Sequence, residues 1–162
     1  EISFFCRIEM GLSDAYLSVF SLFLGLISAA MVGASIYLIV KEKSDLTKAI
    51  LGISCYYALV ALMGLGFKSF LGGDAIWTLL LCALFIFQFF LFIVFVFYPN
   101  QTLAKLGEYA TKGNDTPLVM SYNFVSNNFK FFQAAMGILA GAILLALLCL
   151  CFRNYRRQSS SL

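Results

Sequence analysis

Apolar residues follow one another in long runs along this chain, and charged residues gather between and beside the runs. Four runs cover residues 15–40, 46–67, 75–98 and 131–152. At about 1.5 Å of rise per residue, a helix of such a length crosses a hydrocarbon core about 30 Å thick. The runs are too long and too evenly apolar for the strands of a membrane barrel. The pattern therefore predicts four transmembrane helices.

Short charged segments join the first three runs. Residues 41–45 connect the first run to the second, and residues 68–74 connect the second to the third. Connections this short place consecutive helices side by side and antiparallel. The sequence therefore predicts an all-α membrane protein: a four-helix transmembrane bundle of up-down-up-down topology, in a single domain over residues 1–162.

One longer connection, residues 99–130, precedes the last run. Its apolar residues recur at helical spacing in two stretches, which indicates two short helices, and a turn-rich tip at residues 112–117 separates them. We expect a short helical hairpin that extends the third and fourth spans beyond the membrane. Its two helices are expected to pack on each other through two stripes: Leu103, Leu106 and Ala110, and Tyr122, Val125, Phe129 and Phe132.

The composition indicates that lipid surrounds the chain. It is 62% hydrophobic and 12% charged, with a mean hydropathy of +0.92, whereas soluble domains are about half apolar and a quarter charged. The net charge of +3 comes without the run of basic residues that follows nucleic acid, so a nucleic-acid partner is excluded. The expected partners are membrane lipids and other integral membrane proteins.

The residue types that carry most enzyme chemistry are missing. The chain has no histidine, which removes the commonest general base and metal ligand. None of its five cysteines has zinc-site spacing, and no nucleophile is paired with a base. We therefore expect no enzyme activity, cofactor, metal or small-molecule substrate. No Asp, Glu, Lys or Arg lies in the central part of any run, which argues against a pump or coupled transporter.

Two signals bear on orientation. Arg153, Arg156 and Arg157 follow the last run and favour a cytoplasmic C-terminus. The 99–130 connection carries glycosylation sequons at Asn100 and Asn114, which fit an extracytoplasmic loop, although several lysines share that side. We expect both termini in the cytoplasm, in the plasma membrane or a secretory-route organelle. The alternative is a mitochondrial or plastid membrane.

Small residues mark places where helices can approach each other. Gly25, Ala29 and Gly33 are four residues apart on the first helix, and Gly137 and Gly141 are four apart on the last. Such spacing lets two backbones come close, which drives helix association in lipid. We predict that these residues pack the bundle. Dimerisation through the last helix is the alternative.

Gln88 lies near the middle of the third helix. A buried amide in lipid needs a partner on a neighbouring helix, so a structural hydrogen bond is predicted and a substrate contact is the alternative. The many phenylalanines of this helix point in all directions, toward lipid or a partner protein.

Cys149 and Cys151 lie beside basic residues and, with Cys6, are candidates for palmitoylation. The alternative is that they are inert thiols that help packing.

This layout resembles that of the tetraspanin family over most of the chain. It has four spans, a very short loop between the second and third, and one larger loop between the third and fourth. Gly25, Ala29 and Gly33 resemble the small-residue seam of the family's first helix, and Gln88 lies where the family often carries a polar residue. Residues 123–157 resemble the family's last extramembrane helix, fourth span and Cys-then-basic ending.

The chain departs from the family in its large loop. Residues 99–130 include no cysteine, so the family's Cys-Cys-Gly motif and disulfide-stapled subdomain are absent. The large loop and the first loop are shorter than in the family, and the Asn common in its first helix is missing. The resemblance therefore implies a reduced, tetraspanin-like bundle whose partner contacts use the membrane helices or the short hairpin.

The leading hypothesis from the sequence is a non-catalytic scaffold that binds other membrane proteins laterally. The aromatic third helix and the hairpin, through Tyr122, Phe124 and Phe129, would contact the partner. One alternative is an accessory subunit of a large respiratory, photosynthetic or channel assembly, which also needs no catalytic residues. A small transporter or channel is a further alternative, and it would need a polar seam of Gln88 and serines such as Ser28.

Overall fold

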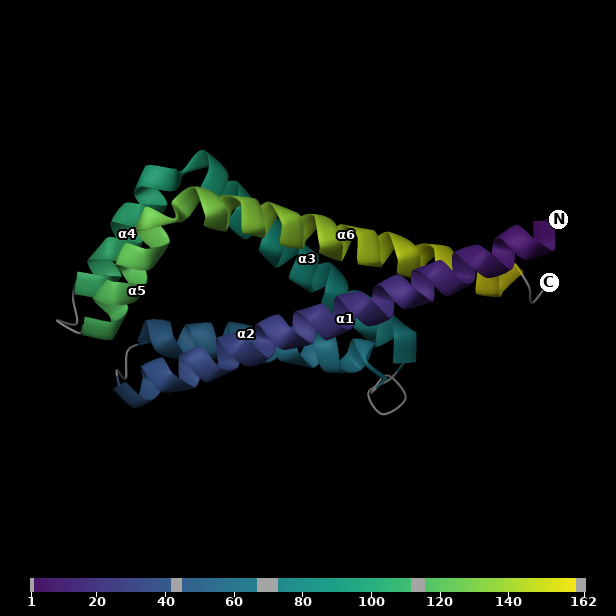
Figure 1. The fold of residues 1–162 in the computed structure, drawn as a ribbon, viewed down its shortest axis with the longest axis horizontal. Helices are drawn as coiled ribbons and strands as arrows, with labels where there is room; N and C mark the ends of the chain where they lie inside the picture. Colours follow the sequence, from purple (N-terminus) through teal and green to yellow (C-terminus); the bar gives the residue numbers. More distant parts are fainter. Residues whose placement is uncertain (1, 42–44, 67–72, 112–115, 160–162) are drawn as a thin grey trace.

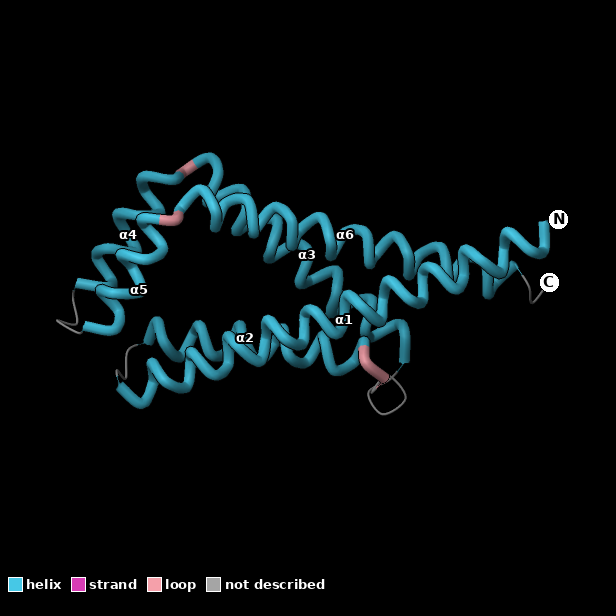
Figure 2. Tube along the Cα trace, in the orientation of Figure 1, coloured by secondary structure: helices cyan, strands magenta, loops and turns pink. Residues whose placement is uncertain are grey.

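The structure is a computed structural model that describes residues 2–41, 45–66, 73–111 and 116–159. This part of the chain is almost entirely helical (Figure 2). Its helices are α1 (Ile2–Lys41), α2 (Asp45–Gly64), α3 (Gly73–Phe97), α4 (Pro99–Thr111), α5 (Thr116–Asn127) and α6 (Phe129–Ser159). Four of them, α1, α2, α3 and α6, are long and apolar enough to cross a membrane, as expected for an integral membrane protein.

Two helix ends differ from the predicted ends. α1 begins at Ile2, and the part of it that is apolar enough to span a membrane begins at Gly11 and not near residue 15. α2 ends at Gly64 and not at residue 67. Gly66 has a φ of +130°, a backbone conformation that interrupts a helix and that glycine adopts without steric strain.

The hairpin begins at a proline. Pro99 is the first residue of α4, where its missing N–H is not needed for a helical hydrogen bond. A proline disfavours helical geometry at the residue before it, and Tyr98 separates α3 from α4. The chain turns at this point, so α4 and α5 run across the ends of α3 and α6 (Figure 1). The two predicted short helices are present and pack on each other, and they turn away from the axes of α3 and α6 instead of continuing them.

The four long helices are arranged as two pairs. α1 packs along α2, and α3 packs along α6, with more extensive contacts than any other helices described. The two pairs lie close together at the end that holds the termini and spread apart toward the hairpin (Figure 1). α5 also contacts α1, so the hairpin connects the two pairs at the end where they diverge.

The buried core lies where the two pairs converge. All four long helices contribute apolar side chains to it: Leu17, Phe20 and Leu24; Tyr57, Val60, Ala61 and Met63; Trp77, Leu81 and Leu84; Ile143, Ala146 and Leu150. The outward faces of the same helices are also rich in large apolar side chains. This is the distribution that a bundle surrounded by hydrocarbon requires, because water does not cover those faces.

Candidate functional site

Small hydroxyl residues line most of the contact between α1 and α2. Ser21, Ser28 and Ser35 are seven residues apart on α1 and are buried, as are Thr47 and Ser54 at the same spacing on α2. Each of the three α1 serines donates its hydroxyl to a carbonyl one turn earlier in its own helix, at 2.6 to 2.9 Å. The hydroxyl oxygens of Ser35 and Ser54 are 3.3 Å apart. These side chains satisfy their own polar atoms and let the two backbones approach.

The structure does not bring Gly25, Ala29 and Gly33 together in one seam. A Cβ built on Gly25 would lie 3.8 Å from the Cβ of Ala61, so Gly25 faces α2. Ala29 and Gly33 are exposed, and a Cβ on Gly33 would have no atom within 4 Å. The buried face of α1 follows the serine spacing instead, which turns Ala29 and Gly33 outward.

The contact between α3 and α6 uses Gly137 but not Gly141. A Cβ on Gly137 would lie 2.9 Å from Cε2 of Phe92, so this ring packs directly on the α6 backbone. Gly141 is exposed, and a Cβ there would have no atom within 4 Å. Gln133 adds a hydrogen bond from its Nε2 to the carbonyl oxygen of Phe95, 2.6 Å away. Gly141 therefore belongs to the outer surface of the bundle.

Gln88 is buried and joins three helices. Its side-chain oxygen accepts a hydrogen bond from the Tyr57 hydroxyl of α2. Its Nε2 lies 3.3 Å from the carbonyl oxygen of Met136 on α6 and donates to it. Both ends of the amide are thus used within the protein, as the predicted structural hydrogen bond requires. The amide holds α3 against both neighbours at the depth where the two pairs meet.

We expect Gln88→Leu to lower the free energy of unfolding by about 0.6 to 2 kcal/mol, the usual range for an interhelical hydrogen bond in lipid. Tyr57→Phe should cost a similar amount, because it leaves the amide oxygen without this donor. The double variant should cost less than the sum, because it removes both polar partners together. Titration of the detergent-solubilised protein with dodecyl sulfate measures all three values. Strictly additive losses would contradict the direct coupling of the two side chains.

Side-chain hydrogen bonds to main-chain carbonyls fasten one helix pair to the other. The Tyr16 hydroxyl of α1 donates to the Ala142 oxygen of α6 at 2.9 Å. Two further bonds join α2 and α3: the Tyr56 hydroxyl of α2 donates to the Leu80 oxygen at 2.7 Å, and the Trp77 Nε1 of α3 donates to the Val60 oxygen at 3.1 Å. Such bonds are directional, so they fix the rotation of each helix about its own axis. Apolar packing alone constrains this rotation less.

Arg153 joins α6 to both α1 and α3 at the end that holds the termini. Its Nη2 is 2.8 Å from Oδ1 of Asp74, and its Nη1 is 3.3 Å from Oδ1 of Asp14. Asp74 lies in the first turn of α3, where the helix dipole favours a carboxylate. From the sequence, Arg153 was used only to predict on which side of the membrane the C-terminus lies. All three charges lie at ends of apolar runs, and an antiparallel order brings those ends together.

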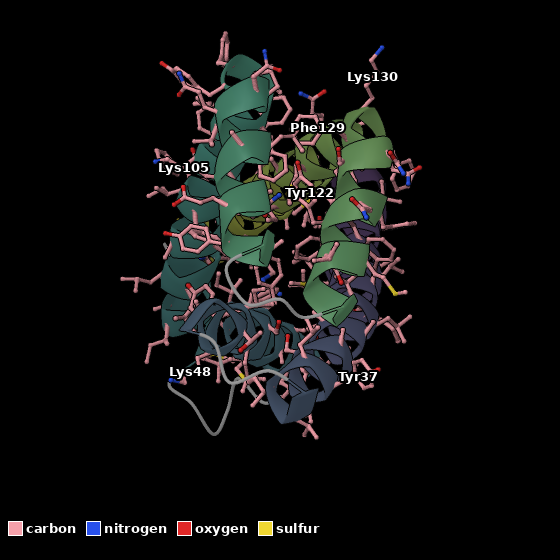
Figure 3. All side chains as sticks on the ribbon, turned by 90° about the vertical axis from the view of Figure 1, so that its left-hand side faces the viewer. Tyr37, Lys48, Lys105, Tyr122, Phe129 and Lys130 are labelled. Atoms are coloured by element: carbon pink, nitrogen blue, oxygen red, sulfur yellow. The ribbon has the colours of Figure 1, made fainter. Side chains whose placement is uncertain are left out.

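The three residues that were expected to contact a partner differ in their surroundings. Tyr122 packs against α4, since a Cβ on Gly107 would lie 3.1 Å from its hydroxyl oxygen (Figure 3). Phe129 stacks on Phe95 of α3, with ring centroids 5.4 Å apart. Of the three, Phe124 is the one that is exposed. Tyr122 therefore holds the two hairpin helices together, and Phe129, the first residue of α6, joins α6 to α3.

The candidate modification sites lie at both ends of the bundle. Asn100 is exposed in the first turn of α4, whereas Asn114 lies outside the described residues. Cys151 is exposed and Cys149 is half-buried near the end of α6. The side chain of Cys6 lies outside the described part of the structure. The two described cysteines and Asn100 are accessible to different degrees, and Cys151 is the more accessible thiol of its pair.

The outward faces of the helices are the surfaces on which this protein could bind a partner. Within the described ranges, no group of three or more acidic, cysteine or histidine side chains could hold a metal ion. No protein-family model, curated protein or solved structure matches the chain. The exposed residues include small side chains on α1 and large apolar side chains on α3 and α5.

Proposed function

We propose that the protein is a non-catalytic, tetraspanin-like scaffold that binds other integral membrane proteins laterally within the bilayer. An exposed patch of small residues on α1 carries the proposal, and it consists of Ala29, Ala30, Gly33 and Ala34. Helices associate in lipid where small residues let two backbones come close. The packing of α1 on α2 uses the opposite, serine-lined face, so this patch is free for the helix of a partner.

The outer face of α3 supports a second contact area. Leu79, Ile86, Phe90 and Phe97 are large apolar side chains that point away from the core. Large side chains of this kind and small-residue patches are complementary in shape, since one fills the space that the other leaves. A partner helix with bulky residues would fit α1, and one with small residues would fit α3.

The proposal includes a topology and a location. The spans alternate across the bilayer, both termini lie in the cytoplasm with Arg153, and the hairpin with Asn100 lies on the other side. This orientation belongs to the plasma membrane or the secretory route, where Cys151 is open to palmitoylation. A glycan on Asn100 distinguishes this scaffold from an accessory subunit of an organellar complex, because such a subunit would carry none.

Replacing Gly33 by leucine should abolish partner binding without unfolding the protein. The new side chain fills the small-residue patch, but a Cβ there meets no atom of the protein itself within 4 Å. Gly52→Leu is the matched control, since Gly52 is exposed on α2 and is equally free of neighbours. Cross-linking in native membranes, followed by mass measurement, should show a defined heteromeric complex for the wild type and Gly52→Leu, and its loss for Gly33→Leu.

The fold of each variant is checked by near-ultraviolet circular dichroism of its tyrosines. A complex that persists in Gly33→Leu contradicts the assignment of the α1 patch. A wild type that stays a monomer in its native membrane contradicts the scaffold itself. Loss of the complex in Gly141→Leu alone would instead assign lateral binding to the outer face of α6.

A further inference from the structure

α5 lacks charge and yet presents large apolar side chains outward. Its residues, Thr116–Asn127, include no Asp, Glu, Lys or Arg. Met120 and Phe124 are 71% and 63% exposed, and they lie four residues apart, on one face of the helix. Tyr122 points the other way and packs on α4. Ser121, Asn123 and Asn127 are exposed as well, so the exposed side of α5 is uncharged and combines two large apolar side chains with small polar ones.

α4 has the opposite character on its outer side. Gln101, Ala104, Lys105, Glu108 and the aromatic Tyr109 are exposed on α4, and Lys105 points away from α5 (Figure 3). The two helices of one hairpin thus present different chemistry to their surroundings. The exposed side of α4 carries charge, whereas that of α5 is uncharged and carries Met120 and Phe124.

The hairpin is held close to the ends of the spans. α4 starts at Pro99, two residues after α3 ends at Phe97, and α5 ends at Asn127, two residues before α6 begins. No linker separates these short helices from the spans, and both run across the span ends (Figures 1 and 3). A hairpin attached in this way stays close to the ends of both spans.

The apolar exposure of α5 continues along α6. Phe124, Phe131 and Ile138 follow one another at intervals of seven residues, and the last two are 72% and 74% exposed. Ile138 lies within the part of α6 that is apolar enough to span a membrane. The same outward apolar positions therefore run from the lipid-facing surface of the span into the hairpin.

We infer that α5 lies in the boundary between the headgroups and acyl chains of the bilayer, with Met120 and Phe124 inserted among the lipids. The polar outer side of α4 faces water. The hairpin then acts as an interfacial anchor with an apolar and a polar side. It fixes the α3–α6 pair at one depth, and through its contact with α1 it sets the separation of the two pairs. Phe124 is a lipid contact in this arrangement and not a contact for a protein partner.

The test measures contact with lipid directly and needs no protein partner. The variants Met120→Trp, Phe124→Trp and Lys105→Trp are reconstituted into vesicles of phosphatidylcholine, with or without bromine near the headgroup end of the acyl chains. Trp77, the single native tryptophan, stays in place and is fully buried, so the wild-type signal is subtracted as a constant background. Iodide in the buffer measures exposure of each new tryptophan to water.

The expected result is opposite behaviour of the two helices. Tryptophan at 120 or 124 should lose fluorescence to the brominated lipid, emit at shorter wavelength and resist iodide, while tryptophan at 105 should lose fluorescence to iodide alone. Iodide quenching at 124 as strong as at 105 overturns the inference, because α5 would then face water. Protection of 120 and 124 from both quenchers also overturns it, because another copy of the protein would then cover this face. Neither result bears on the α1 patch, which the Gly33 variants test separately.

Discussion

Replacing Gly64 by leucine should prevent α1 and α2 from packing and lower the free energy of unfolding by about 3 kcal/mol, at the upper end of the usual cost of overpacking. A Cβ on Gly64 would lie 2.7 Å from the Cβ of Ser21 and 2.9 Å from Cζ2 of Trp77. Both neighbours are fully buried, so neither has space to move aside. The better helix propensity of leucine, about 0.8 kcal/mol over glycine, is too small to offset this clash.

Gly33→Leu is the matched control for this effect, because a Cβ on Gly33 would have no atom within 4 Å. It should change the free energy of unfolding by less than about 0.5 kcal/mol. Dodecyl sulfate titration, followed by the near-ultraviolet circular dichroism of the tyrosines, measures both variants. Ser21→Gly should recover part of the stability lost in Gly64→Ala, since it removes the nearest clash. Equal stability of Gly64→Leu and Gly33→Leu would show that α1 and α2 are not in contact at Gly64.

The positions of the spans followed from apolar run length alone, but the face that each span buries did not. On α1 the expectation followed glycine and alanine, because small apolar residues are the familiar sign of close helix packing in lipid. Ser21, Ser28 and Ser35 are also small, and their hydroxyls bond to their own helix, so they serve equally well. Their seven-residue spacing, matched by Thr47 and Ser54 on α2, was the signal that could have identified the seam.

For the hairpin, too, the sequence predicted the helices but not which residues they contact. Helical spacing predicted one stripe that included Tyr122 and Phe129, but the two residues lie on different helices and contact α4 and α3 respectively. The direction of the hairpin depended on Tyr98 and Pro99, where a proline ends α3 and starts α4. The Gln88 amide could be placed at the centre of a span, yet its partners came from α2 and α6, which no local pattern identifies.

Replacing Trp77 by alanine should be among the most damaging changes in the bundle. Its side chain is fully buried among core residues of the four long helices, and its Nε1 donates to the Val60 oxygen of α2. In soluble cores such a truncation costs about 3 to 5 kcal/mol. Lipid is as apolar as the core, so the transfer part of that cost falls away while the cavity and the lost hydrogen bond remain. We therefore expect a loss of about 2 to 3 kcal/mol.

Trp77→Phe separates the two remaining contributions, because it keeps most of the ring volume and removes the donor. It should cost about 1 kcal/mol, the net worth of one hydrogen bond. Phe90→Ala is the matched control on the same helix, since Phe90 points outward and its loss should cost less than about 0.5 kcal/mol. The same detergent titration, followed by tyrosine circular dichroism because the tryptophan is gone, measures all three. If Phe90→Ala proved as costly as Trp77→Ala, the inner and outer faces of α3 would have to be exchanged. The aromatic outer face would then be part of the fold and unavailable to a partner.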